Sequence, residues 1–213
     1  MSSVLRTSPS VRLLSHGDSA RIRVVPPHQP APLDELFALA QGYAEFTMRN
    51  LGRVPPSLLA MSPNGPIHFI PASLKDARAK DSFANTARLV CLAYGVTAAV
   101  IVLEAWMKTA KPGETLDTTE PPSEAFDRQE VVVITGEAIG QQKQKLLPII
   151  RTDAGGFFGF GEHAGPKFDN YKGRFAQIIP PKKPTAENQE VAKTMLAAMG
   201  ITEASLRSKP ERN

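Results

Sequence analysis

Apolar residues recur at helical spacing between Leu33 and Leu51, with acidic residues early in the segment and Arg49 near its end. This charge order suits a helix dipole, and Gly52 is a good terminator. The pattern therefore predicts a helix over 33–51. The apolar positions are Leu33, Leu36, Phe37, Leu39, Ala40, Tyr43, Ala44, Phe46 and Met48.

Two short apolar runs follow, Ser57–Met61 and Ile67–Ile70, on either side of Pro63-Asn64-Gly65-Pro66. Asn-Gly between apolar runs indicates a hairpin, because both residues tolerate a positive φ. We expect two antiparallel strands here. The neighbouring prolines favour a sheet edge or irregular strand ends.

The remainder predicts two more helices and at least three more strands. Ser73 is the expected N-cap of the next helix, with Asp76 as its capping-box partner and Gly95 closing it after Tyr94. A β-branched strand over 96–106 and a hairpin of strands 130–138 and 142–152 follow. The last helix begins after an N-cap at Thr185 and ends at Gly200.

This order predicts an α+β fold with one antiparallel sheet of about five strands and two or three packing helices. The order α-β-β-α-β-β-β-α resembles the roadblock and profilin type of fold, in which two helices lie on one face of a five-stranded sheet. The resemblance is topological and implies no function. We divide the chain into a disordered, basic, Pro-rich tail (1–31), a globular α+β domain (32–180), and a linker with a C-terminal helix and basic tail (181–213).

The net charge of +4 is unevenly distributed along the chain. The tail at 1–30 carries four arginines and one aspartate, 166–213 carries nine basic and five acidic residues, and the centre at 31–165 is slightly acidic, with twelve basic and fifteen acidic residues. An argument for nucleic acid from overall charge is therefore weak, because phosphate binding needs a local cationic surface.

The remaining bulk features favour a soluble cytoplasmic protein. The uncharged run 89–103 is shorter than the roughly 20 residues of a membrane helix, and it predicts a helix end followed by a buried strand. Cys91 is the single cysteine, which favours a reducing compartment. Within an apolar helix, its thiol is expected to be buried rather than activated. The Arg- and Ser-rich N-terminus also faintly resembles an organellar transit peptide.

The stretch Thr152–Glu162, TDAGGFFGFGE, interleaves three phenylalanines with glycines. No helix pattern follows to support phosphate binding. The GFFGF segment loosely resembles the signature strand of RNA-recognition motifs and cold-shock domains, which implies base stacking. The residues of that hypothesis are Phe157, Phe158, Phe160, Lys167, Lys172 and Arg174. The alternative is a core strand in which Phe158 and Phe160 share the buried face and Phe157 takes the other.

Two acidic groupings complete the candidates. A long loop without apolar periodicity carries Glu114, Asp117, Glu120, Glu124 and Asp127, which suit a basic partner or form a solvated loop. Asp153, Glu162 and His163 would form the centre of a metal-dependent enzyme, although their spacing matches no metal signature.

We therefore expect a non-enzymatic interaction or adaptor module that binds another protein, with no cofactor and no membrane. Single-stranded nucleic-acid binding is the first alternative to this hypothesis, and the metal-dependent enzyme is the second.

Overall fold

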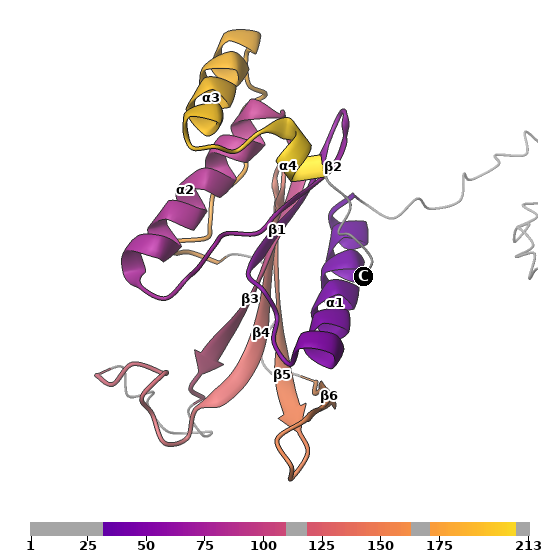
Figure 1. Ribbon diagram of the computed structural model, residues 1–213, viewed down its shortest axis with the longest axis vertical. Coiled ribbons are helices and arrows are strands. Elements are labelled where there is room, and N and C mark those ends of the chain that lie inside the picture. Colours follow the sequence, from indigo (N-terminus) through magenta and orange to yellow (C-terminus); the bar gives the residue numbers. More distant parts are fainter. Residues whose placement is uncertain (1–31, 110–118, 163–170, 208–213) are drawn as a thin grey trace, which may run out of the picture.

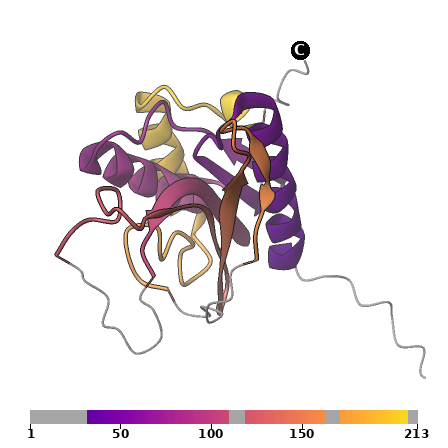
Figure 2. The same ribbon diagram turned by 90° about the horizontal axis from the view of Figure 1, so that it is seen from below.

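The computed structural model describes residues 32–109, 119–162 and 171–207. Its centre is one curled antiparallel sheet of six strands in the order β2-β1-β3-β4-β5-β6, so the predicted α+β class is confirmed. Helices lie on both sides of the sheet (Figures 1 and 2). The elements are α1 (Pro32–Leu51), β1 (Ser57–Ser62), β2 (Gly65–Phe69), α2 (Ala77–Ala93), β3 (Ala98–Met107), β4 (Gln129–Ala138), β5 (Gln141–Arg151), β6 (Phe157–Phe160), α3 (Ala186–Ala198) and α4 (Glu203–Arg207).

Helix α1 covers one face of the sheet with most of the predicted apolar positions, although Leu39 and Phe46 are exposed. Leu33, Leu36 and Ala40 are buried there against β3 and β4. Gly136 of β4 permits this close approach, because a Cβ at that position would lie 2.4 Å from a ring carbon of Phe37.

Helix α2 covers the opposite face. Phe83, Val90 and Cys91 are buried in the same apolar cluster as Ile101 of β3. Helix α3 packs on the outside of α2 and adds Leu196 to this cluster, while α4 adds Leu206 (Figure 1). The division of the chain before residue 181 stays a prediction. Helices α3 and α4, which lie after that division, contribute to the same apolar cluster as α2.

The start of α2 differs from the prediction. Asp76, rather than Ser73, is the N-cap, and its carboxylate accepts the Ala79 amide proton at 2.7 Å. Ser73 instead accepts a bond from the amide of Lys75 at 3.3 Å. The predicted capping box is thus wrong, and Leu74 and Lys75 belong to the loop before the helix.

The strand count also differs, because the Phe-rich stretch adds a sixth strand to the five expected. Apolar clusters on both faces show that α1 and α2 lie on opposite sides of the sheet. The roadblock- or profilin-like arrangement, with two helices on one face, is therefore not confirmed. The hairpin β1–β2 is confirmed, and Gly65 takes the positive φ of its turn.

Candidate functional site

Strand β3 is longer than the strand beside it. Strand β1 pairs with β3 only from Ser57 opposite Val102 to Met61 opposite Ala98, whereas β4 pairs with β3 as far as Met107. Residues Leu103–Met107 therefore pair on the β4 side alone, and Figure 1 shows this end of β3 extending past β1. Their other edge carries backbone groups that no described strand uses.

The sequence explains why β1 begins late. Pro55 and Pro56 precede Ser57, and proline has no N–H to offer to a ladder. The amide of Val54 turns aside and donates to the carboxylate of Glu104 at 2.6 Å. Partial burial raises the pKa of Glu104, and the bond from Val54 opposes that rise. This contact ties the α1–β1 connection to the flank of β3.

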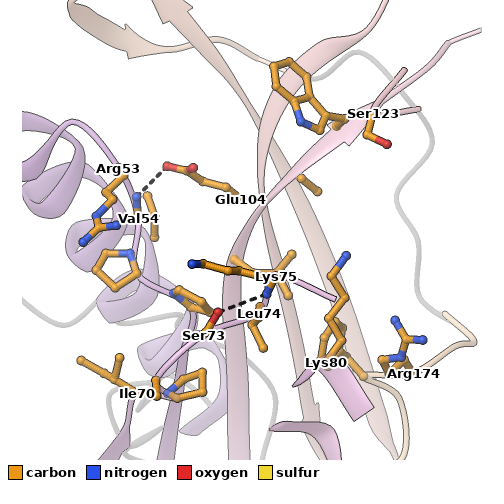
Figure 3. Close-up of a pocket in the computed structure, with 18 of the residues that line it drawn as sticks. Arg53, Val54, Ile70, Ser73, Leu74, Lys75, Lys80, Glu104, Ser123 and Arg174 are labelled. Carbon is orange, nitrogen blue, oxygen red and sulfur yellow. Dashed lines mark hydrogen bonds between the residues drawn. The ribbon is translucent and has the colours of Figure 1, made fainter. Parts of the chain in front are cut away.

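The free end of β3 lies in a cleft of about 880 Å³ (Figure 3). Leu74, Leu103 and Phe175 supply apolar lining and pack against the core on the α2 side. Trp106 lies farther along β3, with the guanidinium of Arg128 over its ring at 4.5 Å. The lining residues come from the α1–β1 and β2–α2 connections, the start of α2, β3, and the segments at 122–123 and 174–175.

The charged lining of the cleft is mainly basic, with Arg53, Lys75, Lys80 and Arg174 against the single acid Glu104. Arg174 forms an ion pair with Asp81 at 2.6 Å. Arg53, Lys75 and Lys80 form no ion pair with any carboxylate in the described part of the chain. The cleft lining therefore carries a net positive charge, of which Glu104 and the pairing of Arg174 with Asp81 offset a part.

Glu137 of β4 holds the segment that directly follows Arg174 and Phe175 of the cleft lining, and no sequence pattern singled it out. Its buried carboxylate accepts the amides of Gln177, Ile178 and Ile179 at 2.5, 2.8 and 3.2 Å. It also accepts bonds from the Tyr171 hydroxyl at 3.1 Å and the Gln142 amide group at 3.2 Å. Burial and the Glu137 charge raise the pKa of Tyr171, which stays a proton donor.

Arg88 of α2 holds the same segment from the helix side. Its guanidinium donates to the carbonyl oxygens of Arg174, Ala176 and Gln177 at 2.8, 3.0 and 3.3 Å. Glu137 thus satisfies three successive amides, and Arg88 satisfies three carbonyls of the same segment. Together they fix Arg174 and Phe175 at the side of the cleft.

The prediction that Phe158 and Phe160 share one face of the strand, with Phe157 on the other, is wrong. A bulge between β5 and β6 pairs Ile150 with Gly159 and Arg151 with Phe157. Phe157 and Phe160 therefore meet, with ring centroids 5.0 Å apart, and pack against the α1-side core. Phe158 is 69% exposed. A bulge shifts the two-residue alternation of side chains between the faces of a strand, and no feature of the sequence indicated this bulge.

The basic residues of the nucleic-acid hypothesis are described only in part. Arg174 lines the cleft beside α2, Lys172 is exposed, and Lys167 lies outside the described residues. The cation over an aromatic ring of this strand is Arg49, 5.5 Å from the centroid of Phe157.

The acidic loop is described only in part. Glu114 and Asp117 lie outside the described residues. Glu120 lies 3.6 Å from the ammonium of Lys108, and the amide of Glu124 donates to the Pro121 carbonyl at 2.9 Å in a turn. Asp127 is exposed.

The metal hypothesis involves Asp153 and Glu162, both of which are exposed, and His163, which lies outside the described residues. Within 32–109, 119–162 and 171–207, no group of three His, Cys, Asp or Glu side chains is placed to hold a metal ion. Cys91 is buried as predicted, and desolvation together with the Glu137 charge raises the pKa of its thiol.

Comparison with known proteins adds no relative: no family model, curated protein or solved structure matches this chain significantly. Among the described helices, none is long and apolar enough to cross a membrane.

Proposed function

We propose that this chain is a non-enzymatic interaction module whose partner, another protein, binds in the basic cleft beside β3. The observation that supports this proposal is the unpaired edge at Leu103–Met107, of which residues 103–106 line a cleft of about 880 Å³. An unpaired strand edge attracts another chain, and soluble proteins usually cover or charge such edges.

The chemistry of the lining favours binding over turnover. Its one carboxylate, Glu104, already accepts the amide proton of Val54, and the described lining holds no His, Cys or Asp that would complete an acid–base pair. Apolar side chains with a few convergent polar groups are typical of a binding pocket.

Selection from a random peptide library displayed on phage tests the proposal. The full chain is compared with a double variant of the cleft, Arg53→Glu with Lys75→Glu. A matched control, Lys182→Glu with Lys183→Glu, makes the same charge change at two exposed residues outside the cleft lining. We expect enrichment on the wild type and the control, and loss of binding on the cleft variant. No enrichment, or equal binding to all three proteins, would contradict the proposal.

One observation favours single-stranded nucleic acid as a second candidate, namely the exposed ring of Phe158. An exposed aromatic on a strand is the kind of surface on which a base stacks. Three results would favour this candidate instead. Oligonucleotide binding would weaken as salt is added, it would weaken in a Phe158→Ala variant, and it would be unchanged in the cleft double variant.

A further inference from the structure

We propose that the partner contributes an extended acidic segment, which adds to the sheet as a strand beside Leu103–Met107. This inference rests on the proposed function and specifies its partner. Three features of the cleft support it: the free backbone edge, an apolar surface beside that edge, and an excess of positive charge.

The first feature is a backbone edge that, among the described residues, has neither a covering helix nor a lysine. The edge strand β2 is covered by α4, whose Arg207 donates to the carbonyl oxygens of Asn64 and Pro66 at 3.0 and 3.4 Å. Strand β5 carries Lys143 and Lys145 where it extends beyond its pairing with β6. Lysines and covering elements are the common protections of such edges.

The free end of β3 reads Leu-Glu-Ala-Trp-Met and contains neither lysine nor proline. Five residues of strand span roughly 17 Å, which gives room for a segment of about five residues. Main-chain hydrogen bonds supply affinity when a peptide adds to a sheet edge in this way.

The second feature is the apolar surface on one flank of this edge. Leu74, Leu103 and Phe175 are partly buried against the α2-side core and remain part of the cleft lining. Side chains alternate across a strand, so every second residue of an added segment would face this surface. We therefore expect apolar residues at alternate positions of the segment.

The third feature is charge. Arg53, Lys75 and Lys80 surround the free end of β3 without ion pairs to described carboxylates, and Arg174 adds a fourth cation (Figure 3). Lys80 of α2 and Arg174 border the apolar surface on the α2 side, and Arg53 lies in the α1–β1 connection, so side chains at both borders of the added segment would lie near a cation. Aspartate and glutamate are the side chains that complement them, and their attraction weakens with salt.

Synthetic forms of a library-selected peptide test the inference on the full chain. One form replaces its Asp and Glu by Asn and Gln, and two others carry N-methyl groups on the odd or on the even backbone amides. N-methylation removes a hydrogen-bond donor without changing the side chains. The amides of an added strand point alternately toward and away from β3. The peptide methylated at the amides that point toward β3 should therefore bind at least tenfold more weakly, and the other methylated peptide should lose much less affinity.

We expect the selected sequences to be enriched in Asp and Glu, and the amide form to bind at least tenfold more weakly at low salt. Loss of binding to the Arg53→Glu, Lys75→Glu variant, with binding kept by the Lys182→Glu, Lys183→Glu control, places the peptide in the cleft.

The possible failures are distinct. A peptide that binds in the cleft but tolerates both methylated sets equally overturns strand addition. A cleft-bound peptide that keeps its affinity in the amide form overturns the acidic character of the segment. Either result leaves the proposed function standing. A library that yields no cleft-dependent peptide overturns both.

Discussion

Removal of the Glu137 carboxylate is the sharpest perturbation of the wall that carries Arg174 and Phe175. In a Glu137→Ala variant, the amides of Ile178 and Ile179 lose their acceptor inside the protein. Each buried amide left without a partner costs about 1–3 kcal/mol. Relief of the buried charge and relaxation of the segment offset part of this cost, so we expect the free energy of unfolding to fall by about 3–4 kcal/mol.

Urea unfolding followed by the fluorescence of Trp106, the single tryptophan, measures this loss. Glu124→Ala removes an exposed carboxylate and should change stability by less than about 0.5 kcal/mol. Glu137→Gln retains one acceptor oxygen but places an NH₂ group among donors, so an intermediate loss is expected. A loss of less than about 1 kcal/mol in Glu137→Ala would refute the assignment of this carboxylate as the anchor of the wall.

Three further predictions concern other parts of the molecule. Burial lowers the pKa of His68 below its usual 6.5, so the unfolded chain binds this proton more readily. Stability should therefore fall as the pH drops below about 6.5 toward the lowered folded pKa, and His68→Gln should reduce that fall in urea titrations at several pH values. Gly136→Ala should cost about 1–3 kcal/mol because the new Cβ meets Phe37, whereas Gly159→Ala, with open space around it, should cost less; equal melting shifts would contradict the packing. Phe158→Ala should leave stability within about 0.5 kcal/mol, because its ring is exposed, and a larger loss by urea unfolding would place that ring in the core.

The helices and most strands were predictable because their signals are local. Three examples are the apolar period of α1, the turn at Gly65 and the N-cap at Thr185. In each case the residues that form the signal are close together in the sequence. The side of the sheet that α2 covers was not predictable in this way. It depends on packing between distant segments, such as Phe83 with Phe175, whose ring centroids are 5.8 Å apart.

The candidate site was harder to predict because it arises from strand lengths rather than from a motif. Pro55 and Pro56 gave a local signal that β1 begins late. The sheet order alone determines that β3 is the neighbour of β1 and is therefore the strand left with an unpaired edge. Glu137 offered one usable signal, an acid shortly after the apolar run 131–134 of its strand. Its donors lie some forty residues later in the chain, so no local pattern identified them.

Amide hydrogen exchange at Leu103–Met107 shows whether a partner strand pairs with this edge, when the free protein is compared with the protein bound to a library-selected peptide. We predict that the amides of this stretch that point away from β4 exchange quickly in the free protein and at least tenfold more slowly in the complex, while those bonded to β4 change little. Slow exchange of all five amides in the free protein, or unchanged exchange when the peptide is bound, would contradict the account.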